Sequence, residues 1–121
     1  MFDISKNKII TVNRGDSFEF NLMVNQGTVL NEVAYIMAAN DKVYFALMEP
    51  NQKFEDAIIV KIYTKEDQWS NGEITVHFDA SDTENLHPGL YYYQVKLRTI
   101  TENSDDEVTT VIGKTKFILL D

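Results

Sequence analysis

Apolar residues recur at every second position through most of this chain. The pattern begins with Phe18, Phe20, Leu22 and Val24, which alternate with Glu19, Asn21 and Met23. The same period recurs at 43–48, 58–63, 74–78 and 91–98, and a further strand-like stretch runs through 111–120. Because successive side chains of a strand point to opposite faces, this period predicts strands that each bury one face.

Residues typical of turns separate these segments. Asn-Gln-Gly follows the first strand-like run, Glu-Pro-Asn ends the second, and His-Pro-Gly introduces the tyrosine-rich one. This spacing predicts an all-β fold, an immunoglobulin-like antiparallel β-sandwich of about seven to eight strands that forms a single domain over residues 1–121. The side chains expected in its core are Phe18, Phe20, Phe45, Val60, Val76, Tyr91, Tyr93 and Val95.

Three segments depart from simple alternation. Residues 33–40 are predicted to form a strand that ends in a turn. Residues 79–86 are predicted to form a short helical turn before the tyrosine-rich strand, with Asp79 or Ser81 as its N-cap and Glu84 in capping-box spacing from Ser81. Residues 101–107 are predicted to be an acidic loop.

Composition excludes several classes of function. The 121 residues carry 19 acidic and 11 basic side chains, for a net charge of −8, which disfavours nucleic acid as a partner because phosphate contacts need Lys and Arg. The absence of cysteine excludes disulfide scaffolds, thiol nucleophiles and cysteine-based metal sites. The longest apolar run, 33–39, is far shorter than a membrane span of about 20 residues. The first residues lack the pattern of a signal peptide, so we expect a protein that is cytoplasmic when synthesised, with or without later incorporation into a virion.

No catalytic motif is visible. The chain has no phosphate-binding Gly-Lys-Ser/Thr loop, no G-x-G-x-x-G and no G-x-S-x-G. Its two histidines, His77 and His87, are expected to be ordinary surface residues rather than zinc ligands. We therefore predict a protein that is not an enzyme and needs no cofactor.

Two short motifs suggest ligands but have simpler interpretations. Asp79, Asp82 and Glu84 are the first place to look for a cation, although their spacing does not match an EF-hand. The tripeptide 14–16 is Arg-Gly-Asp, which integrins recognise, but a tight turn before a strand is the favoured interpretation. A cation-stabilised adhesive domain that uses this tripeptide is therefore a hypothesis that ranks below the protein-interface and carbohydrate-binding hypotheses given below.

Four aromatic residues are expected outside the core: Tyr44, Tyr63, Trp69 and Tyr92. Exposed aromatic rings on a β-sandwich either stack on sugar rings or anchor a protein interface. The protein interface is favoured, because an outer sheet face that carries Met48, Ile59 and Tyr63 is costly to leave in water.

The segment 86–97 carries more information than any other. A leucine, then Pro-Gly, then a tyrosine at the start of a strand is typical of the corner before the sixth strand of many immunoglobulin-like sandwiches. In such corners the tyrosine hydroxyl bonds back to the chain upstream. Here Tyr91 is the candidate tyrosine, and Leu86 and Pro88 are expected to fix the course of the chain that leads into its strand.

Seven segments in order resemble the immunoglobulin-like N-terminal domain of tail baseplate upper proteins from phages and prophages of Gram-positive bacteria. They are 14–20, 41–45, 57–61, 72–76, 82–86, 88–93 and 116–120, and their order covers nearly the whole chain. The resemblance implies a non-enzymatic structural domain of a tail or baseplate that docks onto neighbouring subunits or onto itself. Family members often continue into receptor-binding or stalk regions, whereas this sequence ends soon after the domain, so an accessory protein or a fragment is expected. The alternative function is a carbohydrate-binding module that uses the exposed aromatics.

Overall fold

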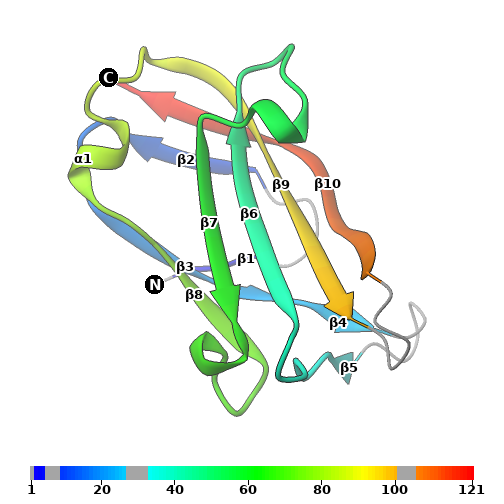
Figure 1. Cartoon of the computed structure of the whole chain (residues 1–121). Helices are drawn as coiled ribbons and strands as arrows, with labels where there is room; N and C mark the ends of the chain where they lie inside the picture. The colour runs from blue at the N-terminus through cyan, green and yellow to red at the C-terminus, as the bar shows by residue number, and fades with distance from the viewer. Residues whose placement is uncertain (1, 5–8, 27–32, 101–105) are drawn as a thin grey trace.

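Two β-sheets face each other across an apolar core (Figure 1). The computed structural model describes residues 2–4, 9–26, 33–100 and 106–121. The three-stranded sheet has the order β1 (Phe2–Ile4), β3 (Phe18–Met23), β8 (Glu73–Phe78). The five-stranded sheet has the order β2 (Ile10–Asn13), β10 (Asp106–Leu120), β9 (Gly89–Ile100), β6 (Lys42–Met48), β7 (Ile59–Thr64). The predicted all-β sandwich is thus confirmed.

Smaller elements connect these strands. A two-stranded ribbon joins β4 (Asn25–Gln26) to β5 (Val33–Ala34), and the helical turns are η1 (Phe54–Asp56), η2 (Lys65–Asp67) and α1 (Ala80–Thr83). Strand pairing is antiparallel except for β1 with β3 and β2 with β10, which are parallel. The N-terminal segment therefore adds an edge strand to each sheet in turn. No helix within the described ranges is long and apolar enough to cross a membrane.

Alternate residues of the facing strands fill the core. Aromatic rings dominate its centre: Phe18 stacks on Phe78 with ring centroids 4.8 Å apart, and Phe45 stacks on Tyr93 at 5.4 Å. Aromatic pairs in these arrangements stabilise a core beyond the area they bury. The predicted core residues that are buried are Phe20, Phe45, Val76, Tyr91, Tyr93 and Val95, while Phe18 is partly buried against them.

Strand β7 buries the face opposite to the one predicted. Val60, expected in the core, is 46% exposed, whereas Ile59 packs against the core. The register with β6 decides this, because Ile59 lies opposite the buried Leu47 and Val60 lies opposite Ala46 on the outer face. Lys61 interrupts the inner face of β7, so the alternation in the sequence indicates the other face, that of Val60 and Ile62, as the buried one.

The less regular segments also differ in part from expectation. Only Val33 and Ala34 of 33–40 are in a strand, and the following residues are held by side chains instead: Asp41 accepts hydrogen bonds from the Tyr35 hydroxyl at 2.6 Å and the Ala38 N–H at 2.8 Å. Asp106 and Glu107, predicted to be in a loop, are the first residues of β10; the rest of that predicted loop, 101–105, lies outside the described residues. The predicted helical turn is confirmed as α1, with Asp79 rather than Ser81 as its N-cap.

Candidate binding surfaces

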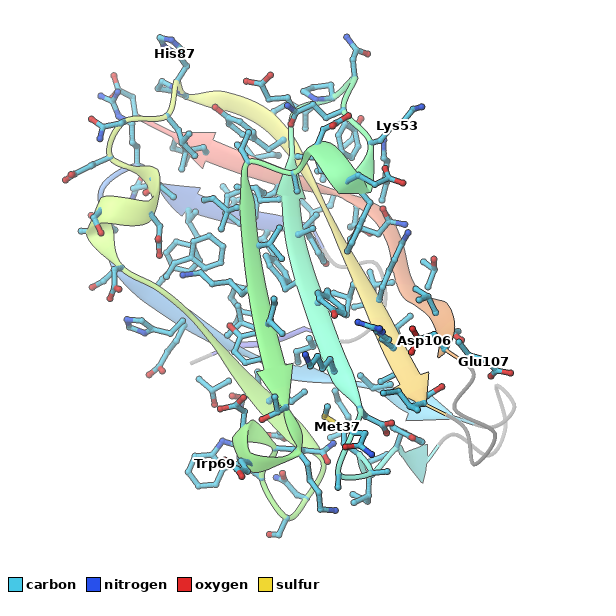
Figure 2. All side chains as sticks on the ribbon, in the orientation of Figure 1. Met37, Lys53, Trp69, His87, Asp106 and Glu107 are labelled. Carbon is cyan, nitrogen blue, oxygen red and sulfur yellow. The ribbon has the colours of Figure 1, made fainter. Side chains whose placement is uncertain are left out.

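The four aromatic residues predicted to make contacts lie in three different places. Tyr44 on β6 and Tyr92 on β9 are half-buried on the outer face of the five-stranded sheet. Trp69, 64% exposed, lies in the turn before β8 and belongs to the outer face of the other sheet. Figure 2 shows Trp69 projecting from the molecule, well away from Asp106 at the start of β10. The four residues therefore do not form one aromatic row.

Tyr63 closes the edge of the sandwich instead of facing a partner. It packs against the core, and its hydroxyl is hydrogen-bonded to the backbone of His77 on β8. Burial raises the pKa of Tyr63 to about 12. The expectation that Tyr63 lies outside the core is therefore wrong, because β7 presents its odd-numbered side chains to the interior.

The connection between β6 and β7 folds over the outer face of the five-stranded sheet. The Lys96 Nζ of β9 lies 4.3 Å from the centre of the Phe54 ring, and the Lys114 Nζ of β10 donates to the Gln52 carbonyl at 2.8 Å. Ala46 and Met48 of β6 are fully buried although neither alternates toward the centre of the core. Met48, expected to be exposed, is thus covered by its own chain.

A groove remains beside this connection. Its lining residues are Tyr44, Phe54, Lys96, Arg98, Asp106 and Val108, and it encloses about 350 Å³. Arg98 spans it with two hydrogen bonds to Asp106, from Nε at 3.3 Å and from Nη2 at 2.7 Å, and is also hydrogen-bonded to Tyr44. The bond from Arg98 lowers the pKa of Asp106, and the bonds to Asp106 and Tyr44 raise that of Arg98. Both groups are therefore charged at neutral pH, in a groove with aromatic and aliphatic walls.

An aliphatic stripe borders this groove. Val60 and Ile62 point outward from the edge strand β7 and are 46% and 54% exposed, and Ile58, immediately before the strand, is 37% exposed. Ile62 lies directly opposite Tyr44 across the β6–β7 pair, so the stripe continues into the groove. Sequence reasoning missed both features, because the stripe depends on the inner face of β7 and the groove on a pairing between β9 and β10.

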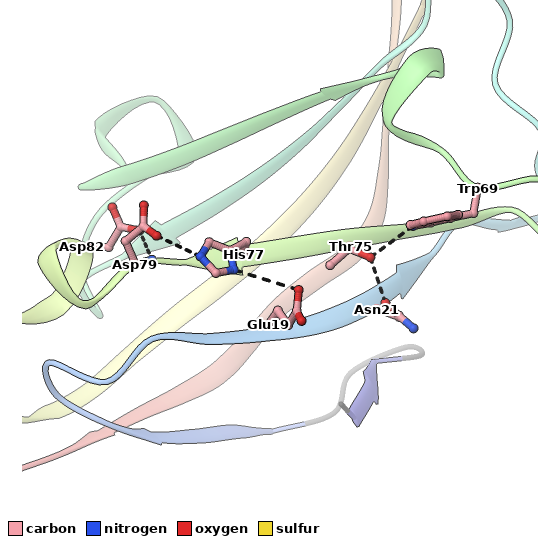
Figure 3. A network of polar contacts seen from close by, with 7 residues as sticks. All are labelled: Glu19, Asn21, Trp69, Thr75, His77, Asp79 and Asp82. Carbon is pink, nitrogen blue, oxygen red and sulfur yellow. Dashed lines mark hydrogen bonds and ion pairs between the residues drawn. The ribbon is translucent and has the colours of Figure 1, made fainter.

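A second, polar surface surrounds Trp69 on the three-stranded sheet. The outward side chains there are linked in series, as Figure 3 shows: the Trp69 Nε1 donates to the Thr75 Oγ1 at 3.2 Å, and that hydroxyl donates to the Asn21 Oδ1 at 3.1 Å. The Asn21 Nδ2 then donates to the Glu73 Oε2 at 2.9 Å. These residues, with Ser70 and Asn71, line a shallow hollow.

Two of the three predicted cation residues, Asp79 and Asp82, are engaged with other groups. Asp82 accepts hydrogen bonds from the Lys61 Nζ at 2.9 Å and the Asp79 N–H at 2.8 Å, and Asp79 contacts His77 at 2.8 Å (Figure 3). Glu84 is exposed at the end of α1. Among the described residues, no group of three or more His, Asp and Glu side chains is placed to hold a metal ion. The acidic residues of α1 thus serve as cap and ion-pair partners.

The Arg-Gly-Asp tripeptide forms a structural turn, as predicted. Gly15 has a φ of 80°, its N–H donates to the buried Thr83 Oγ1 at 3.0 Å, and the Arg14 Nη2 pairs with Asp121 at 2.6 Å. The turn therefore ties α1 and the last residue of the chain to the start of β3.

The tyrosine corner is present as predicted. The Tyr91 hydroxyl donates to the His87 carbonyl at 2.6 Å, and Leu86 packs against the core beneath it. Pro88 is exposed and lines a hollow with Glu49, Pro50 and Tyr91. This corner therefore stabilises the fold by joining the start of β9 to the segment before it.

Comparisons with known proteins leave the family open. The chain matches no protein-family model and no curated protein.

Proposed function

We propose that this chain is a non-enzymatic structural domain of a phage or prophage tail or baseplate, and that it binds a neighbouring tail subunit through the outer face of its five-stranded sheet. The observation that carries the proposal is the outward aliphatic stripe of Ile58, Val60 and Ile62 beside the groove. Contiguous exposed apolar side chains are costly in water and mark interaction surfaces.

The groove supplies the specificity that an aliphatic stripe lacks. Tyr44 and Phe54 offer aromatic walls, and aromatic residues and arginine are enriched where protein interfaces are strongest. The Arg98–Asp106 pair holds one positive and one negative charge in fixed positions. A partner with complementary charges would bind in one register, and a partner with like charges would be rejected.

The resemblance in segment order supports the tail setting, and the tyrosine corner and sandwich agree with the immunoglobulin-like fold it implies. In such an assembly the domain is a virion component. Glycan binding, the alternative function expected from the sequence, would need a different surface, because Trp69 lies on the other sheet.

Co-purification with the proteins encoded by neighbouring reading frames tests the proposal. We expect the wild-type chain to retain a tail protein and the double variant V60E/I62E to lose at least about tenfold in affinity, because two charges would be buried in an apolar contact. The matched control is Asn85→Glu, which adds charge at an exposed residue after α1 and should leave retention unchanged. Circular dichroism establishes that all variants fold.

Two results would contradict the proposal. One is unchanged retention of the partner by folded V60E/I62E. The other is a chain that retains none of these proteins; sedimentation would then show whether a second copy of the chain occupies the face instead.

A further inference from the structure

Trp69 is exposed in a way that packing does not explain. Its side chain is 64% exposed, the largest value among the exposed large apolar residues of the described part of the chain. The turn that carries it is well ordered by hydrogen bonds: the Gly72 N–H donates to the Trp69 carbonyl at 2.9 Å, and the Trp69 N–H donates to the Glu73 carbonyl at 2.8 Å. The indole is therefore presented to solvent from a fixed backbone.

The indole is also fixed in orientation. Its Nε1 donates to Thr75, so the polar edge of the ring is directed at β8, and Figure 3 shows the ring edge-on beside Thr75, which in turn contacts Asn21. A side chain held in one orientation before binding loses less entropy when a ligand arrives.

The lining of the hollow distinguishes the kind of ligand. Apart from Trp69, every lining residue is polar: Asn21, Ser70, Asn71, Glu73 and Thr75. A protein hot spot is typically an aromatic anchor among apolar neighbours. One aromatic face surrounded by amide, hydroxyl and carboxylate groups fits a sugar, whose ring offers C–H groups on its face and hydroxyls around its rim.

Asn21 and Glu73 retain hydrogen-bonding capacity for the hydroxyls at the rim of a sugar ring. Asn21 uses one amide proton on Glu73 and accepts at Oδ1 from Thr75, and no bond to another described residue uses its second amide proton. The Glu73 Oε2 accepts from Asn21, and no bond between described residues uses its Oε1. Paired acceptor and donor groups of this kind recognise adjacent hydroxyls.

Charge restricts the sugar to a neutral one. Glu73 is part of the hollow, Glu19 and Asp79 flank His77 further along the same face, and the whole chain carries −8. Anionic sugars and phosphate-bearing polymers would be repelled. We propose that Trp69, Asn21, Glu73 and Thr75 form a binding site for a neutral saccharide, independent of the protein contact on the opposite sheet.

Trp69 is the only tryptophan, so its fluorescence reports on this site alone. The wild-type chain is titrated with neutral tetrasaccharides of glucose, mannose, galactose and N-acetylglucosamine, and with an anionic tetrasaccharide of galacturonic acid. We expect a saturable fluorescence change with at least one neutral sugar in the micromolar to millimolar range, and no change with the anionic one.

Calorimetry on variants tests which groups bind. Trp69→Ala should abolish the heat of binding, and Thr75→Val should weaken binding about tenfold by freeing the indole and Asn21. Leu120→Ala, which truncates an exposed side chain of the five-stranded sheet outside both sites, is the matched control and should bind as the wild type does.

Three outcomes would overturn the proposal: no neutral sugar shifts the fluorescence while acrylamide still quenches it, only the anionic sugar binds, or binding survives Trp69→Ala. None of these results bears on the tail-subunit contact, which V60E/I62E tests separately.

Discussion

At the scale of single residues, Tyr91 shows how a short motif specifies a contact. Its hydroxyl donates to the His87 carbonyl four positions upstream. The Pro-Gly pair between the two residues is a turn signal that can be recognised in the sequence. Tyr91→Phe removes this hydrogen bond and should lower the free energy of unfolding by about 1 kcal/mol. Thermal denaturation checks it, with Tyr92→Phe on the outer face as the control; equal melting temperatures for wild type and Tyr91→Phe would contradict the assignment.

Gly72 is a residue whose importance depends on a neighbour distant in sequence. It has a φ of 93°, and a Cβ at this position would lie 2.6 Å from the Ala34 Cβ of β5. Both strain and clash therefore oppose any other residue, and Gly72→Ala should destabilise the fold by about 2 kcal/mol or more. Gly113→Ala is the control, because its Cβ would meet no atom within 4 Å. If urea denaturation gave the two variants equal midpoints, the close approach would be refuted.

At the scale of elements, β7 is tied to α1 by charge. Lys61 points inward from the edge strand, lies over the Phe78 ring at 5.1 Å and donates to Asp82, whose other bond caps α1. An inward-pointing lysine also discourages edge-to-edge pairing with another chain. The apolar stripe on the outer face of β7 is therefore suited to contact through side chains rather than to strand addition.

The charge of Asp82 should make the stability of the fold depend on pH in the acid range. Burial raises its pKa, but the bonds from Lys61 and the Asp79 N–H outweigh burial, so the folded-state pKa is lowered. The stabilisation is therefore present above the unfolded pKa of about 3.9 and is lost as pH falls through the folded value. Asp82→Asn should cost about 1 kcal/mol at pH 7 and progressively less as the pH falls through the folded pKa, whereas Ser81→Ala should cost little throughout. A gap between wild type and Asp82→Asn that is as wide at pH 2 as at pH 7 in chemical denaturation would exclude this ion pair.

At the scale of the whole molecule, the tyrosines limit stability in alkali. Hydrogen bonding to Asp41 raises the pKa of Tyr35 to about 12, and burial raises those of Tyr63 and Tyr93 to about 12. Unfolded tyrosine ionises near pH 10, so above that pH the unfolded state releases protons that the folded state retains. The contribution of these tyrosines to stability should therefore be constant from neutral pH to about pH 10 and be lost toward pH 12. Absorbance of tyrosinate, measured in folded and urea-unfolded protein, checks this; coincident titrations would contradict it.

The two outer faces offer different chemistry on one scaffold. The five-stranded sheet presents an aliphatic stripe and a charged aromatic groove, and the three-stranded sheet presents one indole among polar groups. Since the two surfaces share no residue, a protein and a sugar would not compete.

The all-β fold class, most of the core and the tyrosine corner could be predicted from the sequence. Period-two alternation depends only on neighbours along one strand, and the corner joins residues four positions apart. Both can therefore be predicted from a short stretch of sequence. Tertiary structure alone decided which face of β7 is buried, since that follows from pairing with β6. Tertiary structure also brings the site residues together. Trp69 reaches Asn21 through Thr75, and Arg98 contacts Asp106 and Tyr44. These contacts depend on the register between strands, which no local sequence pattern specifies.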